Sequence, residues 1–596
     1  MEFAAAPLPE LVLHDTSTRD EIDPESIAKT WLENLQAKIS QGQLEDVSDL
    51  FIDDSWWRDI VGLSWNITTK RGMSKISQYL QSQVSKSGFG KFDVIHQGVL
   101  QPRLSDLGGL IWIESGFTFE TKAGTGRGIL RLANTGPQQW KAWIVHTTLE
   151  ELSGFPEQSP QESSTAHETK DIQGRFASAN TRSGQSGLAL AARLKALNVK
   201  TLTVDKALQI GDSWNNRYKS IKSHTPRYTD HYPYLDYPSD FPDFLTRNNI
   251  ISWMDHYRKV MGLNVELGVT VGKIDYDNSL RHYTVEIDSQ DGTKRVVTPH
   301  HVVLATGLLS DIPVRPEFEN EGSFDGQIYH SSSHQSASQI PNLEGKKIVI
   351  IGSGTSAHDI AQDFVARGAR AVTMIQRSPH FLISTESQDT FVLAGWKAMP
   401  TRDADLVGTS FPQAIALTLM LGGTKMMAQH DAALLSEMEK AGMAIKRGED
   451  GIGILHHQLL KAGHFYIDQG ACKMIADGRI KVKQSQEGAK GFDQKSVVLG
   501  NGTLIEADVV VLATGFYPAA NLTERIMGKE FSAKIGEIAS MDEEDERVAC
   551  WRPSAAPGFW YMTGSFLWSR TFSRPLALQI KAIEEGLDPD HYASRE

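Results

Sequence analysis

The sequence predicts an α/β fold with two Rossmann-like domains, preceded by an α+β domain. Three observations predict it. A glycine turn, a helix and a strand follow one another at 183–206 and again, after an apolar strand, at 346–376. The phrase Ala-Thr-Gly ends an apolar strand twice. Before residue 154, amphipathic helices precede strands that alternate apolar and polar residues. At 596 residues the chain is too long for one core.

Composition and charge narrow the class of protein. The formal net charge of −13, without a basic block, disfavours a nucleic-acid partner. The only two cysteines, Cys472 and Cys550, form no C-x-x-C pair, which fits a reducing compartment and predicts no metal or disulfide framework. No secretory signal begins the sequence, and no apolar stretch is long enough to span a bilayer. We expect a cytoplasmic protein without a transmembrane segment; peripheral membrane contact and a homodimer stay open.

The N-terminal part predicts a tail at 1–24 and an α+β domain at 25–153. Helical spacing runs from Glu25 to about Gly42 and again at 72–84, and strands are expected at 92–99, 110–120, 127–132 and 140–148. This pattern resembles the SnoaL-like, or nuclear-transport-factor-like, cone. Its polar residues could line a catalytic cavity or could be rim charges on a scaffold or dimerisation module, and we favour the scaffold because no pair has acid–base spacing. They are Asp53, Asp54, Asp59, His96 and Glu114.

Residues 154–182 are rich in Ser, Thr, Gln, Glu and Pro and are predicted to be a linker. The first glycine turn follows, with Gly184 and Gly187, and its second strand ends in Asp205, where a ribose hydroxyl would be held. Its start is irregular. Arg182 occupies the place of the first glycine, and 176–181 is not the apolar run of a central strand. Two explanations stay open: a misassigned exon boundary, or a weakened nucleotide site.

The second glycine turn is complete. An all-apolar strand at 348–351 leads to Gly352, Gly354 and Ala357 in the G-x-G-x-x-A pattern, and a helix follows at 355–367. In this pattern the first glycine allows the tight turn, the second lets a pyrophosphate approach, and the helix N-terminus faces the phosphates. After the next strand stands Arg377, where an NAD site would usually carry an acidic residue. An arginine suits a 2′-phosphate, so the sequence predicts NADPH.

The remaining segments complete both domains. A helix is expected at 246–261, a meander at 263–297, and closing strands before the Ala-Thr-Gly phrases that end at Gly307 and Gly515. Two turns and two closing strands predict two nucleotide domains, the second inserted into the first. We assign 183–313 and 470–596 to the first domain and 314–469 to the second, with a helix-rich stretch at 385–463 that could cover a hydrophobic substrate.

Two further motifs make the resemblance more specific. G-x-x-W-x-x-R-Y begins at Gly211 and includes Trp214 and Arg217, and F-x-G-x-x-x-H ends at His330. With the two glycine turns and the repeated Ala-Thr-Gly, the chain from 183 to its end resembles the class B flavin-dependent monooxygenases, above all the flavin-containing monooxygenase family with its YUCCA-type and fungal members. The extended Baeyer–Villiger motif is not met, since His334 lies where its tryptophan would.

The resemblance implies that NADPH reduces FAD, that O2 adds to form a C4a-(hydro)peroxyflavin, and that one oxygen atom passes to a small organic substrate, here expected to be hydrophobic and from secondary metabolism. It implies a catalytic-pocket role for His224, with a hydrogen-bonded structural role as the open alternative, and a structural role for His330 in the linker between the domains. By position, it implies that FAD is held by Gly184, Gly187, Asp205, Gly211, Trp214 and Arg217, that NADPH is held by Gly352, Gly354, Ala357 and Arg377, and that Thr306, Gly307, Thr514 and Gly515 also lie at the cofactors.

Two other functions stay open at this point. Arg182 and the polar residues before it would suit a degenerate, non-catalytic nucleotide-binding homologue with a damaged FAD turn. An NADPH-dependent disulfide reductase would share the two-nucleotide architecture, but it needs a redox-active cysteine pair, and Cys472 and Cys550 show no such motif.

Overall fold

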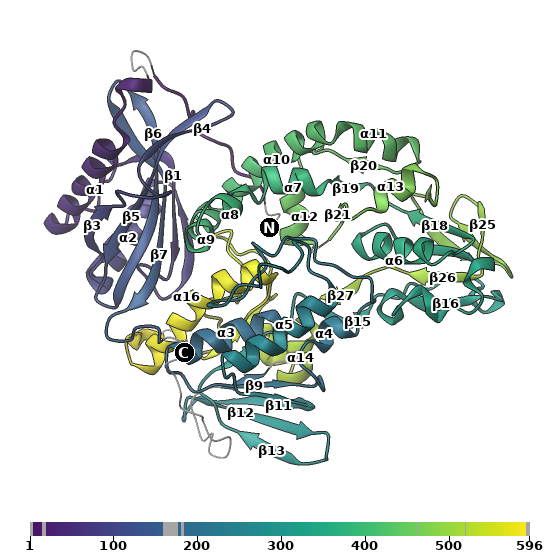
Figure 1. Cartoon of the computed structure of the whole chain (residues 1–596). Coiled ribbons are helices and arrows are strands. Elements are labelled where there is room, and N and C mark those ends of the chain that lie inside the picture. The colour runs from purple at the N-terminus through teal and green to yellow at the C-terminus, as the bar shows by residue number, and fades with distance from the viewer. Residues whose placement is uncertain are drawn as a thin grey trace.

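The computed structural model describes residues 4–14, 19–158, 177–179, 184–461, 463–518 and 520–591. Figure 1 shows an N-terminal domain of helices and a curved sheet on one side of the molecule, and two further α/β parts beside it. The long C-terminal helix α16 (Phe566–Glu584) lies between the N-terminal domain and the first α/β part.

The N-terminal domain is a mixed sheet with two helices against one face. The sheet order is β2-β1-β7-β6-β5-β3, with β4 beside β5, and only β1 and β7 pair in parallel. Helix α1 starts at Pro24 because the Asp23 carboxylate accepts the backbone N–H groups of Glu25 and Ser26, and it ends at Gly42, whose φ is +69°. The elements are α1 Pro24–Gln41, β1 Phe51–Ile60, β2 Ile67–Arg71, α2 Met73–Ser87, β3 Gly90–Val94, β4 Arg103–Leu107, β5 Leu110–Glu120, β6 Gly124–Gly136 and β7 Gln139–Leu152.

Residues 4–14 of the segment predicted to be a tail are packed against the rest of the chain. Ala6 and Leu11 are only 3% and 1% exposed. The Ala6 N–H donates to the Ala414 carbonyl (3.1 Å), and the Ile111 N–H donates to the Leu11 carbonyl (2.8 Å). The tail therefore lies between the sheet of the N-terminal domain and helix α10 (Gln413–His430), and apolar burial there holds a sequence that shows no periodicity.

The first α/β part contains a parallel sheet in the order β10-β9-β8-β14-β28. Residues Ala177–Ala179 form β8, between β9 and β14, so the expectation that 176–181 lacks a central strand is wrong. Backbone pairing does not require an apolar sequence, and the neighbouring strands provide the ladder. The part contains α3 Gln185–Ala196, β9 Leu202–Asp205, α4 Asp212–Asn215, α5 Arg247–Val260, β10 Val265–Leu267, β14 Val302–Leu304 and β28 Phe559–Tyr561, and a meander of β11 Val269–Asp277, β12 His282–Ser289 and β13 Lys294–Val297.

The second α/β part has a parallel sheet in the order β16-β26-β17-β18-β22. Strand β22 (Ile480–Gln484) pairs with β18, and β26 (Val509–Leu512) lies between β16 and β17. The division at residue 470 is therefore wrong: the chain returns to the first part only after β26. The remaining elements of this sheet are β16 Gln327–His330, β17 Lys347–Ile351, α6 Thr355–Ala366 and β18 Ala371–Gln376, with α13 Ala471–Ala476 beside them and a small sheet of β23 Ala489–Phe492, β24 Ser496–Leu499 and β25 Leu504–Glu506.

A two-stranded ribbon joins the two parts. Strand β15 (Leu309–Pro313) leaves the first part and β27 (Phe516–Pro518) returns to it, and the two pair antiparallel. Within the second part, a helical insertion reaches the N-terminal domain. It consists of β19 His380–Ile383, α7 Thr385–Phe391, α8 Ala394–Ala398, α9 Thr401–Thr409, α10, α11 Ala432–Lys440, β20 Ile445–Lys446, α12 Ile454–Leu460 and β21 Phe465–Ile467.

Among the described residues, no single helix is long and apolar enough to cross a membrane. Helices α9 and α10 have the required length and apolar character only when taken together, and they meet at a bend of 102°. Buried residues on both helices contact the N-terminal domain, including Leu406 and Ile415.

A buried ion pair joins the N-terminal domain to the rest of the chain. Both N–H groups on one side of the Arg58 guanidinium donate to the Glu546 carboxylate (2.7 and 2.9 Å), and the two side chains are 2% and 4% exposed. Arg58 also donates to the carbonyl oxygens of Thr409 and Phe411, and Thr69 donates to Glu546. With its hydrogen bonds satisfied in this way, the pair can be buried at a tolerable cost.

Breaking this pair should destabilise the whole protein. We expect Glu546→Ala to lower the free energy of unfolding by roughly 3–5 kcal/mol, because it leaves the Arg58 charge buried without its carboxylate. Urea unfolding followed by tryptophan fluorescence measures the loss. The matched control is Asp54→Ala, which breaks the exposed Arg71–Asp54 pair and should cost about 1 kcal/mol or less. Equal losses in the two variants would contradict the assignment.

Candidate functional site: two glycine turns and the contact between them

The second glycine turn has the geometry that a dinucleotide needs. Gly352 has a φ of +124°, and a Cβ there would lie 2.4 Å from the Ala513 carbonyl oxygen, so only glycine fits. Gly354 precedes α6, and a Cβ there would meet no atom within 4 Å. Ala357 is fully buried against the sheet. The result is an open space at a helix N-terminus that has no side-chain cap among the described residues, which suits a phosphate group.

Arg377 follows the last residue of β18 and is exposed. Its stem lies beside Gly488, where a Cβ would be 3.5 Å from the Arg377 Cδ. The preceding Gln376 is buried and bonds both the N–H and the carbonyl of Ala444. Gln376 therefore has a structural role, whereas the exposed Arg377 at the strand end has no ion-pair partner among the described residues.

The first glycine turn lies at the N-terminus of α3. Gly184 is the residue before the helix, in an extended conformation without a side-chain cap among the described residues, and Gly187 is buried in the first turn. Asp205 ends β9, is fully buried, and accepts the Ala207 N–H (2.9 Å). These places match the fingerprint, because strands β8 and β9 with α3 form its βαβ start. Arg182, on which the doubt about this site rests, lies outside the described residues.

Helices α3 and α16 run side by side from this turn. The Ser186 and Ser569 hydroxyl groups are 2.7 Å apart, and the Gln185 side chain donates to the Gly564 carbonyl (3.0 Å). Ser565 caps α16 by accepting the Trp568 N–H. The N-termini of two helices therefore lie next to each other at the carboxyl edge of the first sheet, where open α/β sheets bind ligands.

The G-x-x-W-x-x-R-Y motif packs beside this edge. Gly211 has a φ of +85° and starts the short helix α4. The Trp214 ring stacks on Phe566, the first residue of α16, at 6.3 Å. Arg217 is exposed, and its guanidinium lies 5.4 Å from the Trp214 ring centre. Trp214 packs against the apolar cores of both α/β parts, so it stands at their junction.

The two Ala-Thr-Gly phrases lie at the two ends of the ribbon. The Thr306 hydroxyl is 3.2 Å from the Tyr561 hydroxyl, which donates to the Gly307 carbonyl. The Thr514 hydroxyl donates to the Val314 carbonyl (2.5 Å), and the Gly515 carbonyl accepts the Val314 N–H. Each phrase thus connects a closing strand to β15 or β27. His330 packs edge-on against Phe516 of β27 (5.3 Å), in keeping with the role in the linker that the resemblance implies for it.

A carboxylate on α6 connects the two α/β parts. Asp359 accepts the Tyr218 hydroxyl (2.6 Å), and its oxygen lies 3.5 Å from His224 Nε2. Burial, followed by the charge of Asp359, raises the pKa of Tyr218 far above its usual value, so Tyr218 remains a donor. The sequence singled out His224 but not Asp359. The only signal was an acidic residue one turn into the glycine-turn helix, which is ordinary in any helix.

Buried histidines surround the second glycine turn. His358 donates to the Gly354 carbonyl (3.0 Å) and stacks on Tyr466 with ring centres 3.9 Å apart. His380 lies beside it and accepts from the Gln376 amide (3.1 Å). Burial and the neighbouring histidines lower the pKa of His380 to about 3. These rings are neutral at physiological pH and act as packing around the turn.

The acidic residues of the N-terminal domain do not form one site. Asp54 and His96 make exposed ion pairs, and Glu114 bonds Arg131 and Arg103. Asp59 accepts from the backbone of 62–64 and from the hydroxyl groups of Tyr79 and Thr147. Asp54, Asp59, His96 and Glu114 thus each have partners within the domain, and Asp53 is exposed. Among the described residues, no group of His, Cys, Asp and Glu could hold a metal ion.

Cys472 and Cys550 do not form the redox-active pair that the disulfide-reductase alternative needs. Cys472 and Cys550 are both free and buried, and they belong to different apolar cores. Burial raises the pKa of Cys550 to about 12 and that of Cys472 further. Such thiols are protonated and unreactive.

Sequence comparison finds relatives over more than half of this chain. The family described as L-lysine 6-monooxygenase/L-ornithine 5-monooxygenase matches residues 241–394. The probable indole-3-pyruvate monooxygenase YUCCA8 of Arabidopsis thaliana is 27% identical over 358 residues, 59% of this chain and 77% of the relative. The indole-3-pyruvate monooxygenase YUCCA1 of Oryza sativa subsp. japonica is 24% identical over 340 residues, 56% and 75%. The chain is similar to these monooxygenases over part of its length.

Solved flavin-dependent monooxygenases are also similar to this chain. A flavin monooxygenase from Stenotrophomonas maltophilia is 16% identical and covers 69% of this chain and 99% of its own, with a TM-score of 0.46. An oxidised steroid monooxygenase bound to NADP is 16% identical and covers 70% and 86%, with a TM-score of 0.48. Members of the flavin-dependent monooxygenase family use FAD and NADPH.

The burial of His380 predicts that the free energy of unfolding depends on pH. The folded pKa is depressed below the unfolded value of about 6.5, so its contribution is complete above pH 6.5 and is lost as the pH falls toward 3. By pH 5 the loss should be about 2 kcal/mol. We expect His380→Asn, which keeps the acceptor for Gln376, to be less sensitive between pH 7 and 5 in urea unfolding.

The matched control is His256→Gln, at an exposed histidine in α5. It should follow the pH dependence of the unaltered protein. The same pH dependence in His380→Asn as in the control would show that His380 does not titrate as described.

Proposed function

We propose that this protein is a flavin-dependent monooxygenase that uses NADPH and O2 to insert one oxygen atom into a small organic substrate. The observation that carries the proposal is the pair of parallel sheets, each of which has a glycine turn at the edge where the strand order changes. At each turn a helix begins whose N-terminus has no side-chain cap among the described residues. The monooxygenase relatives, which span more than half of the chain, support it.

The residues at both turns fit the two cofactors. Position 352 accepts only glycine, and Gly354 leaves a space that a Cβ would partly fill. The exposed Arg377 offers a positive charge for a 2′-phosphate. Gly184 and Asp205 would hold the pyrophosphate and ribose of FAD. When bound, FAD would accept the hydride from NADPH and supply the reaction with O2. The rest of the catalytic task, which is positioning and exclusion of water, belongs to the chain.

The contact through Asp359 would perform part of that task. Tyr218 and His224 approach Asp359 from the first α/β part, while Asp359 stands one turn after Gly354. The carboxylate therefore fixes the NADPH turn relative to the segment that follows Trp214. We assign His224 a positioning role at the cofactors. Because its pKa is raised, Tyr218 stays protonated and donates to Asp359. The hydrogen bond between Tyr218 and Asp359 should therefore not depend on pH near neutrality.

The helical insertion would cover the substrate, which we propose to be hydrophobic and a secondary metabolite. Helices α9 and α10 carry apolar residues that pack toward the N-terminal domain. We propose a cytoplasmic protein whose N-terminal domain is a SnoaL-like scaffold. The degenerate homologue is not favoured, because the first sheet has its central strand β8.

The visible spectrum of the purified protein tests the proposal directly. We expect bound flavin at about one per chain, and NADPH oxidation that consumes O2. Absence of flavin, together with no NADPH oxidation when FAD is added, would refute the proposal.

The NADPH turn can be tested separately with Gly354→Val. The extended backbone at Gly354 accepts any residue and the space around it is open, so the fold should be unchanged while the side chain obstructs the pyrophosphate. We expect the KM for NADPH to rise on the order of tenfold or more, with flavin content retained. The matched control is Gly322→Val, at another glycine with open space around it. An unchanged KM in Gly354→Val would place NADPH elsewhere.

A further inference from the structure

A cavity of about 300 Å³ lies where the N-terminal domain meets the rest of the chain. Its walls come from β1 and β7 of the N-terminal domain, from α3, from the loop 231–236, from α9 and from α16. We call it the junction cavity. It lies beside α3 at Arg193, which is about 13 Å along the helix from Gly184, so it is separate from the phosphate end of the first glycine turn.

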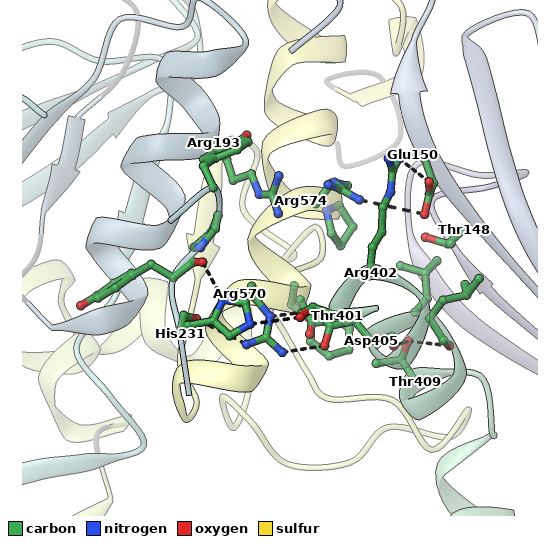
Figure 2. A pocket seen from close by; sticks show the side chains of 18 of the residues that line it. Thr148, Glu150, Arg193, His231, Thr401, Arg402, Asp405, Thr409, Arg570 and Arg574 are labelled. Atoms are coloured by element: carbon green, nitrogen blue, oxygen red, sulfur yellow. Dashed lines mark hydrogen bonds and ion pairs between the residues drawn. The ribbon is translucent and has the colours of Figure 1, made fainter. Parts of the chain in front are cut away.

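The wall of the junction cavity is amphipathic. One part of the wall is apolar. The volume of the cavity lies at the lower end of the roughly 300–1,000 Å³ range of ligand pockets. The other part carries arginines, which Figure 2 shows arranged around Arg574, with Arg193 on one side and Glu150 on the other. The apolar residues are Ile60, Leu149, Leu235, Leu406, Phe572 and Pro575.

The carboxylates that line the cavity already have close partners. Asp405 accepts two N–H groups on one edge of the Arg570 guanidinium (2.9 and 2.7 Å), and Asp236 pairs with His231 (2.9 Å). Glu150 accepts from Arg127 (2.9 Å) and from Arg402. Each of these carboxylates is already paired, so they do not create a demand for a cationic ligand.

Arg574 differs from the other lining arginines. Its nearest carboxylates are Glu157 at 3.7 Å and Glu150 at 4.0 Å, and both are bonded more closely to other arginines. Its Nε–H is buried and has no hydrogen-bond partner among the described residues. Burial and the charge of Arg193 lower its pKa to about 10, which leaves it charged at neutral pH. A largely buried guanidinium with an unmet N–H donor is costly unless an anion completes it.

We propose that the junction cavity binds a small organic carboxylate with an apolar body. The carboxylate would accept the donors of Arg574 through the planar fork of the guanidinium, and the apolar body would lie against Leu149, Leu406 and Phe572. An inorganic anion would leave the apolar wall uncovered, and a neutral molecule would leave Arg574 unmatched. The site requires the N-terminal domain, which supplies Leu149 and Glu150 to it. This inference does not depend on the redox chemistry proposed above.

Calorimetry on the full-length protein as purified tests the site, with phenylacetate as the probe and phenylacetamide as its neutral counterpart. We expect phenylacetate to bind, phenylacetamide to bind at least about tenfold more weakly, and Arg574→Gln to lose the same factor for phenylacetate. The matched control is Arg479→Gln, at an exposed arginine paired with Asp477, which should bind as the unaltered protein does.

A second variant separates loss of the site from loss of the fold. Thr148→Phe fills the cavity from β7 while keeping a residue type that strands favour, so it should abolish binding with the thermal midpoint nearly unchanged. Arg574→Gln should melt no lower than the unaltered protein without ligand, since it removes a poorly paired buried charge. Equal affinity for the acid and the amide, binding that survives both variants, or no binding at millimolar phenylacetate would each overturn the proposal.

Discussion

The buried Arg58–Glu546 ion pair is the constraint on which the arrangement of the whole molecule depends. It joins residues 488 positions apart, and its hydrogen bonds reach the carbonyl groups at the end of α9 as well. Because a buried charge is tolerated only with such partners, the N-terminal domain can take few orientations on the rest of the chain. Helices α9 and α10, the packed tail and the segment before β28 all lie around this contact. The junction cavity therefore has a defined shape, although five separate helices and strands and a loop build it.

Local sequence patterns predicted the parts of the fold that local physics determines. The turn at Gly352 was readable because a positive φ and a close backbone contact restrict that position to glycine. Helix α1 was readable from its apolar spacing, and the Asp23 cap fixes its start. Strand β1 was missed because the second half of the strand is buried on both faces and shows no alternation. The tail and the return point after β26 depend on contacts with distant residues, which no window of sequence contains.

The candidate site divides in the same way. The glycines and Asp205 could be named from spacing, since a phosphate imposes its requirements on consecutive residues. Asp359 could not, because its importance comes from Tyr218 and His224, more than 130 residues earlier, as the 141-residue separation of its bond to Tyr218 illustrates. Arg574 is similar: in sequence it is one of several arginines on a helix, and only the distances to Glu150 and Glu157 distinguish it from its neighbours. Whether a charged side chain has a close partner depends on the tertiary structure, and it cannot be read from the composition of a helix.

The ribbon of β15 and β27 has a mechanical consequence. Entry to and exit from the second α/β part run antiparallel, so its two covalent connections lie about one strand spacing apart, roughly 4.8 Å. A body tethered at two adjacent points can swing about the line between them without stretching either connection. The Asp359 contact also joins the two parts, through residues that do not belong to the ribbon. A protein built in this way can vary the gap between its two ligand turns while both sheets keep their internal hydrogen bonds.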